Sequence, residues 1–291
     1  MNIIHYRDEE WLCECDPSDG GRLTRLRWRD VDLLTQPDPN FLPGEGFESR
    51  PVYGYDDCFP CVAPQKGIPD HGFCWSMRPE SVRLQDGLCC TFIFPGGSRL
   101  HRRLRFEESK LIWAFRIENP TDSDIRAQHV MHALMPPSAI HAIHAPRCAV
   151  CVDSLNGDII PPEAARTPLG LCSKGNARML LLREITTGEV TLHLHNDHRI
   201  RIHFDPVLFP TLGLWMDRGG YPAHAPRQEI AVEPIPGPSG SLKEALDSGQ
   251  ALHVPARSRL DWEIQWSFRV PASAPVSVHR KRAPKGASRI G

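Results

Sequence analysis

Short apolar runs that stop at turn-forming residues recur along the whole chain and constrain its fold more than any other feature. Leu100–Phe106 alternates apolar and polar residues, and Leu111–Ile117 is placed to pair with it across four polar residues. The 28 prolines interrupt strand pairing and favour long loops. The only good helical candidate is Ser241–Leu246, with Ser241 as N-cap and Glu244 at the capping-box position. The sequence therefore predicts an all-β fold built as a large sandwich.

Length and charge narrow the classes of function. The chain has 291 residues, of which 41% are apolar, enough to bury the core of one large β domain, which we expect to span residues 1–272. The net charge of −1 gives no electrostatic basis for binding nucleic acid or an acidic membrane. Residues 273–291 contain the basic run His279-Arg280-Lys281-Arg282, and we interpret this segment as a disordered tail.

Ten cysteines raise the question of disulfides and metals. The N-terminal residues lack a signal-peptide pattern, and no apolar run approaches the roughly 18 residues of a membrane span, so we expect a cytoplasmic protein with reduced thiols. Cys58-Phe-Pro-Cys61 and Cys148-Ala-Val-Cys151 have zinc-site spacing, but both pairs would have to converge and no zinc-ribbon pattern surrounds them. We therefore predict no metal.

A strand that ends on a glutamate is the first candidate for chemistry. In Glu229–Glu233, Ile230 and Val232 would lie on one face of the strand and both glutamates on the other. Proline cannot donate to a ladder, so we expect pairing to stop at Pro234 and to leave Glu233 at the rim of the sheet. A catalytic base would be useful there, and a solvated strand-end glutamate is the alternative.

Two histidines lie on the predicted strand Ile125–Met135. Because the offset between His129 and His132 is odd, a regular strand directs them to opposite faces. A histidine on such an apolar strand is usually a hydrogen-bonded core residue. With a carboxylate partner in a cleft, His132 could instead act as a general acid near neutral pH.

Two other polar groups are candidates for binding. The loop-like segment Gly54–Gly72 contains Asp56, Asp57 and His71, which could bind a ligand or could cap turns. On a strand, His193 and His195 would point the same way, which is a metal-ligand geometry, although no glutamate or cysteine spacing completes a known site.

Four segments, in order along the chain, resemble the aldose 1-epimerase (galactose mutarotase) superfamily, particularly its divergent members. They are an acidic-Phe-Pro segment, a His-Gly-Phe loop, an Asn-Pro turn leading into a histidine strand, and a tryptophan strand followed by a Glu-Pro strand. Their sequences are GYDDCFPCVAP, PDHGFCWSM, FRIENPTDSDIRAQHVMHALMPP and LGLWMDRGGYPAHAPRQEIAVEPIPGPSGSLKEAL.

The resemblance implies a large antiparallel β-sandwich whose concave sheet holds a monosaccharide or sugar phosphate, with no cofactor, in a monomer or homodimer. By motif, Glu233 would take the proton of the anomeric hydroxyl and His132 would protonate the ring oxygen. His71 would bind the sugar and share the developing charge. Three further residues are implied as substrate contacts, through hydrogen bonds, ring-face packing or phosphate charge: Asp57, Trp215 and Arg218.

The chain departs from the family pattern at several points. His132-Ala133-Leu134-Met135 replaces the frequent His-Pro-Tyr-Phe or His-Thr-Tyr-Phe, which leaves His129 as a rival for the catalytic role. His71-Gly72-Phe73 is closer to the hexose-phosphate branch than to the well-known Asn-His-Leu-His-Gly-Gly loop. The sequence leaves open which of Asp56 and Asp57 faces the pocket. A catalytically inactive carbohydrate-binding or regulatory protein and a metal-dependent sugar enzyme are the alternative functions.

Overall fold

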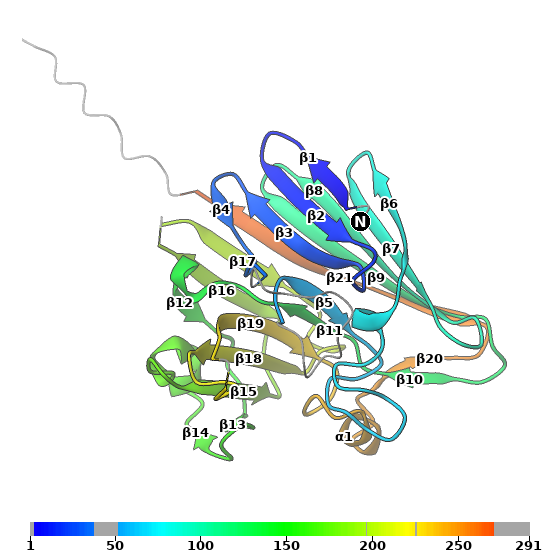
Figure 1. Ribbon diagram of the computed structural model, residues 1–291. Coiled ribbons are helices and arrows are strands. Elements are labelled where there is room, and N and C mark those ends of the chain that lie inside the picture. The colour runs from blue at the N-terminus through cyan, green and yellow to red at the C-terminus, as the bar shows by residue number, and fades with distance from the viewer. Residues whose placement is uncertain (1–2, 38–51, 196, 225, 271–291) are drawn as a thin grey trace, which may run out of the picture.

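Antiparallel strands build two stacked layers in the computed structural model, which describes residues 3–37, 52–195, 197–224 and 226–270 (Figure 1). One layer is an eight-stranded sheet whose strands, in spatial order, are β12 (Ile140–His144), β16 (Glu189–Leu194), β17 (Arg199–His203), β21 (Ser258–Arg269), β9 (Lys110–Asn119), β8 (Arg99–Glu107), β7 (Gly87–Ile93) and β6 (Glu80–Leu84). The predicted all-β class and antiparallel sandwich are confirmed.

Two smaller sheets form the other layer. The first contains β1 (Ile4–Arg7), β2 (Trp11–Asp16), β3 (Arg22–Trp28), β5 (Tyr55–Cys58) and β11 (Val130–Ala133), with β4 (Val31–Asp32) paired to β3. The second contains β14 (Ile159–Ile160), β13 (Val150–Asp153), β15 (Ala177–Arg183), β18 (Thr211–Arg218) and β19 (Gln228–Ile235).

These two sheets meet where β11 lies beside β19, at a junction that we call the β11–β19 seam (Figure 1). Met135, just beyond β11, exchanges two backbone hydrogen bonds with Ile230, of 2.7 and 2.9 Å. The bridge is antiparallel. It joins strands that are almost a hundred residues apart in the sequence and sets their register.

Aromatic side chains fill the space between the two layers. Tyr55 of β5 lies 4.5 Å, centroid to centroid, from Trp113 of β9, and Trp11 of β2 lies 4.9 Å from Phe268 of β21. The buried Trp11 indole donates a 2.6 Å hydrogen bond to the Glu107 carbonyl, so its polar atom is satisfied. Ring contacts between layers explain why alternate residues of these strands are buried.

The predicted hairpin and helix are both present. Leu100–Phe106 lies within β8, pairs with β9 as expected and buries alternate side chains, including the guanidinium of Arg102. The helix α1 spans Leu242–Asp247, and the Ser241 hydroxyl accepts the Glu244 N–H at 3.3 Å. The Glu244 carboxylate does not close the predicted capping box on the backbone; it accepts the Ser239 hydroxyl at 2.8 Å.

The predicted end of the glutamate strand is wrong by two residues. β19 continues through Pro234, which pairs with Leu212, and ends at Ile235. Proline is tolerated because β19 is the edge strand of its sheet, so its missing N–H faces away from β18. Glu233 therefore lies within a strand, opposite Gly213, and not at a loose strand end.

Shorter elements complete the described chain: the β10 (Ile125–Ala127) and β20 (Leu252–Val254) pair, and four 3-10 turns at Cys74–Ser76, Pro137–Ala139, Ala164–Arg166 and Pro168–Leu171. Among the residues that the structure describes, no helix is long and apolar enough to span a membrane. The predicted basic tail, 273–291, lies outside the described residues.

Candidate active site

The register of the β11–β19 seam brings the two predicted catalytic residues together. The seam has one backbone bridge in the described residues, Met135 to Ile230, and counting three residues along each strand from this bridge puts His132 and Glu233 on the same face. The packing agrees with this register, because Leu134 and Ala231 lie in one apolar cluster with Trp215. His132, Glu233 and Trp215 therefore share one face of the layer.

A carboxylate from the neighbouring strand fixes the orientation of His132. Asp56 of β5 lies opposite His132 in the ladder, and its Oδ1 is 2.8 Å from the histidine Nδ1. Its Oδ2 accepts a 2.7 Å hydrogen bond from Arg22, which also donates to Asp19 at 2.9 Å. With a carboxylate at Nδ1, that nitrogen carries the proton, so Nε2 is the reactive nitrogen of His132.

Two further groups lie beside His132. The His71 ring centroid is 5.0 Å from that of His132, and its Nδ1 is 3.1 Å from Asp70 Oδ1. Cys58 of β5 is buried on the same face as Asp56, and one ligand atom each of Cys58, His71 and His132 lie within 4.8 Å of one another. His71 and His132, each implied as a site residue by the resemblance, thus lie next to each other in the structure.

Glu233 is a buried carboxylate that no cation in the described part of the chain approaches within 4 Å, and its residue is only 4% exposed. Burial, together with the negative charges of Asp56 and Glu229, raises the pKa of Glu233 to about 8. A carboxyl group with such a pKa can exchange a proton near neutral pH, as a general acid or base must.

A second glutamate on the same face holds Trp215. Glu229 Oε1 accepts a 3.0 Å hydrogen bond from the Trp215 indole and lies 3.7 Å from Arg227. Burial raises the pKa of Glu229 to about 7, although Arg227 and Trp215 act against that shift. Glu229 is engaged, whereas no partner of the Glu233 carboxylate is found among the described residues, so Glu233 is the better placed of the two to meet a ligand.

His132 and Glu233 have pKa values that are shifted in opposite senses. Burial lowers the pKa of His132, and the attraction of Asp56 compensates only in part. Burial alone would raise the pKa of Asp56, but Arg22 and His132 outweigh it, so Asp56 stays ionised. Near neutral pH these shifts favour a protonated Glu233 and a neutral His132.

The structure does not support the predicted substrate contact at Asp57. Asp57 points to the other face of β5, into the core, and accepts hydrogen bonds from Tyr55 at 2.5 Å and from Arg102. His129 lies there as well, with Nε2 3.0 Å from Asp57, packed on Phe115 at 4.4 Å between centroids. Asp56 therefore faces the site, and His129 is a core residue.

Arg218 also lies away from the predicted site. It falls on the face of β18 opposite Trp215, and its guanidinium donates a 2.9 Å hydrogen bond to the Cys172 carbonyl. The predicted phosphate contact at Arg218 is not supported by this orientation. Arg227, near Glu229, is an arginine on the correct side that the sequence did not single out.

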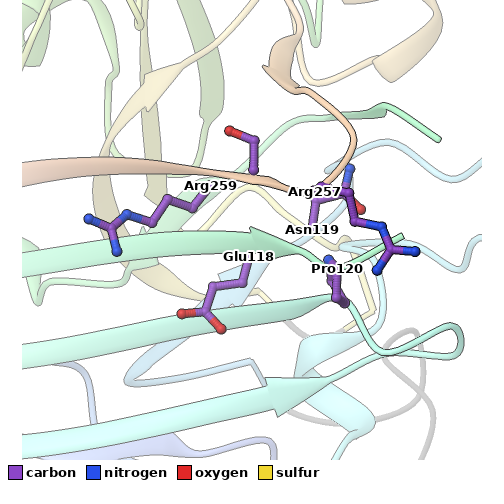
Figure 2. Close-up of a pocket in the computed structure, with 6 residues that line it drawn as sticks. Glu118, Asn119, Pro120, Arg257 and Arg259 are labelled. Carbon is purple, nitrogen blue, oxygen red and sulfur yellow. The ribbon is translucent and has the colours of Figure 1, made fainter. Parts of the chain in front are cut away.

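A surface hollow of about 410 Å³ lies on the other sheet, where the end of β9 lies beside the start of β21 (Figure 2). Its charged side chains have partners elsewhere: Arg257 contacts Asp122 at 2.8 Å, and Glu118 contacts His101 at 3.3 Å. None of the predicted site residues lines it. We therefore place the candidate site at the seam and not in this hollow.

The predicted histidine cluster has neighbouring rings, but its nitrogen atoms do not form a compact group of metal ligands. His193 has ring neighbours at 4.7 Å in His144 and 5.8 Å in His141, and His195 lies 5.6 Å from His141. Within the described ranges, the only group of three His, Cys, Asp or Glu ligand atoms within 4.8 Å of one another is the one at the seam. Within the same described ranges, no group of three such ligand atoms draws on both CxxC pairs, and Cys61 donates to the Ala63 carbonyl.

Solved structures agree with this architecture. No protein-family model matches the chain, and no curated protein matches it in sequence. The Slr1438 protein of Synechocystis superposes with a TM-score of 0.73 at 19% identity, covering 92% of this chain and 95% of that one. A galactose mutarotase related enzyme of Lactobacillus acidophilus gives 0.67 at 13%, covering 94% and 99%. A galactose mutarotase-like protein of Clostridium acetobutylicum gives 0.70 at 14%, covering 92% and 95%.

These likenesses establish a galactose mutarotase-like fold for the chain. The resemblance predicted from the sequence is therefore confirmed at the level of the fold, with the low identities of a divergent member. Activity and substrate are a separate matter, because unrelated functions share folds and are decided by the site.

Proposed function

We propose that the chain is an aldose 1-epimerase-type isomerase that interconverts the anomers of a monosaccharide or sugar phosphate, with Glu233 and His132 as its acid–base pair. The observation that carries this proposal is that both residues lie around Asp56 at the β11–β19 seam: Asp56 lies 2.8 Å from the His132 Nδ1, and its negative charge helps to raise the pKa of Glu233. The fold shared with mutarotase-like proteins supports the choice of a sugar as substrate.

The net effect of the first step is to move one proton from the anomeric hydroxyl to the ring oxygen of the sugar, through two separate transfers. Glu233 in its ionised form accepts the proton of the anomeric hydroxyl while protonated His132 gives a proton to the ring oxygen. The bond between the anomeric carbon and the ring oxygen breaks, which leaves an open-chain aldehyde, protonated Glu233 and neutral His132. Rotation about the adjacent carbon–carbon bond and reversal of both transfers give the other anomer.

The opposite pKa shifts suit this cycle. Protonated Glu233 with neutral His132, the state favoured by burial, has the same proton count as ionised Glu233 with protonated His132. Either arrangement places one proton on the pair, which is the proton count that the reaction needs. His71 would contact the sugar beside His132, and Trp215, held by Glu229, would pack against the sugar ring.

The first test is anomer interconversion itself. Freshly dissolved glucose, galactose and their 6-phosphates, followed by polarimetry or NMR, should equilibrate faster with the protein than without it. Sugar binding by calorimetry without acceleration of any of them would favour the alternative function, a carbohydrate-binding or regulatory protein.

Asp56 is expected to act as a positioning residue. The Asp56→Asn substitution should lower kcat by about 10- to 100-fold and change KM little, because the imidazolium of His132 loses its anionic partner. Asp19→Asn is the matched control, since it also removes a carboxylate from Arg22 but does not contact His132. Equal losses of kcat in both variants would show that the effect comes from Arg22 and not from His132.

The pH dependence should reveal the shared proton. If the pair needs one proton, kcat/KM falls as pH rises through about 8, where Glu233 loses it, and also falls on the acid side when His132 gains a second. The Glu229→Gln substitution removes a negative charge that raises the pKa of Glu233, so the alkaline limb should move to lower pH. With a chelator present, a rate that rises through pH 8 would contradict this scheme.

A further inference from the structure

The candidate site contains a thiol that the proposed acid–base chemistry does not use. Cys58 of β5 is 1% exposed, and its Sγ belongs to the group in which one ligand atom each from Cys58, His71 and His132 lie within 4.8 Å of one another. One thiolate and two imidazoles make a borderline-soft donor set, which suits Zn²⁺ and its relatives better than Mg²⁺ or Ca²⁺.

Each of the two histidines has a carboxylate oxygen close to its Nδ1. Asp56 Oδ1 is 2.8 Å from Nδ1 of His132, and Asp70 Oδ1 is 3.1 Å from Nδ1 of His71. The Asp56 carboxylate at Nδ1 of His132 orients that ring, favours a proton on that nitrogen and makes Nε2 a stronger ligand, as in many zinc-bound histidines, while Asp70 places a negative charge beside His71. Asp56 and Asp70 therefore lie just outside the three proposed metal ligands.

We propose that Cys58, His71 and His132 bind one zinc-class divalent cation, with the fourth coordination position left to solvent. In a tetrahedral zinc site the ligand atoms are about 3.4 to 3.6 Å apart, so ligand atoms that lie within 4.8 Å of one another have to contract by no more than about 1.4 Å. His71 lies in the segment between β5 and the 3-10 turn at Cys74–Ser76, and movement of its side chain can supply that contraction. Coordination releases the Cys58 thiol proton to solvent.

The consequence for activity is inhibition, and this part rests on the proposed function. A cation on Nε2 of His132 occupies the nitrogen that would protonate the ring oxygen, so bound metal and turnover exclude each other. The same ion also displaces the sugar from His71. Zinc would therefore act as a competitive inhibitor of the epimerase.

Binding is tested without reference to activity. The full chain, purified with a chelator and a phosphine reductant and then freed of chelator, is titrated with Co²⁺ and read by absorption spectroscopy. One equivalent should give the intense d–d bands of a tetrahedral site together with a thiolate-to-cobalt charge-transfer band, and Zn²⁺ should displace them. No band, or no displacement by Zn²⁺, would overturn the proposal.

Variants locate the ion. Cys58→Ser should abolish the charge-transfer band and weaken Zn²⁺ binding on the order of 100-fold or more, and His71→Ala should weaken binding while keeping the band. Cys61→Ser is the matched control, because this buried cysteine follows closely on Cys58 and donates to the Ala63 carbonyl. A band that survives in Cys58→Ser would assign the metal to another thiol and reject the site.

Activity measurements separate this proposal from the proposed function. Each protein's rate with Zn²⁺ is divided by its own rate in chelator, so full activity of Cys58→Ser is not required. Wild type and Cys61→Ser should be inhibited, and Cys58→Ser should resist. If none of the zinc-free proteins turned over sugar, the proposed epimerase function would be refuted. The metal site would then be judged from the Co²⁺ titration alone. Tight Zn²⁺ binding without inhibition would show that the bound ion is not coordinated by His132.

Discussion

The Glu233→Gln variant is expected to lose anomer interconversion, with kcat lower by about 10²- to 10⁴-fold. The amide has the size of the carboxyl group but cannot take a proton from the anomeric hydroxyl. Because Glu233 is buried and no cation in the described residues pairs with it, the substitution should cost little stability and leave sugar binding measurable. Polarimetry for kcat and calorimetry for the dissociation constant check the two halves of this expectation.

Glu229→Gln is the matched control for that experiment. It changes a second buried glutamate on the same strand and face, one that accepts the Trp215 indole N–H at 3.0 Å. An amide oxygen can still accept this bond, so kcat at the pH optimum should fall less than about tenfold. A loss as large as that of Glu233→Gln would mean that the base has been assigned to the wrong glutamate.

The largest effect on stability is expected from Arg102→Met. Arg102 of β8 is 1% exposed, and its guanidinium donates to Asp57 and to the Gly21 carbonyl inside the sandwich. Methionine preserves much of the apolar stem but leaves the Asp57 carboxylate buried without its cation. Removing one partner of a buried ion pair costs about 3–5 kcal/mol, which urea unfolding followed by circular dichroism should record.

The adjacent Arg103→Met provides the comparison. Arg103 points to the other face of β8, and its 2.8 Å pair with Asp86 is largely exposed. Exposed pairs contribute about 0–1 kcal/mol, so this variant should unfold close to the wild-type urea concentration. If the two variants lost similar amounts of unfolding free energy, the buried Arg102–Asp57 pair would contribute no more to stability than the exposed Arg103–Asp86 pair. Arg102→Lys, which keeps a charge, should fall between them.

Much of the site was predictable because strand periodicity is a local property. The odd offset between His129 and His132 put them on opposite faces, and the structure has one in the core and the other at the seam. The same alternation predicted that Glu229 and Glu233 share a face. The pairing of β8 with β9 followed from two adjacent runs and a short polar turn.

Other features depended on partners distant in the sequence. Asp56 and Asp57 are neighbours with the same side chain, so nothing local distinguishes them. Arg22, 34 residues before Asp56, draws one carboxylate to the site face, and Arg102, 45 residues after Asp57, draws the other into the core. An arginine at a core-facing strand position was the available signal, but its partner could not be named.

The sequence by itself determined the all-β class, the main hairpin, the helix cap and the faces of the candidate residues, because each depends on neighbours a few residues apart. Only the tertiary structure decided that β11 meets β19, and hence that His132 and Glu233 share a face, with Asp56 and Cys58 beside His132. The physical reason is that a seam between strands distant in the chain is fixed by packing and by backbone hydrogen bonds, whose register the side-chain pattern of either strand alone leaves open.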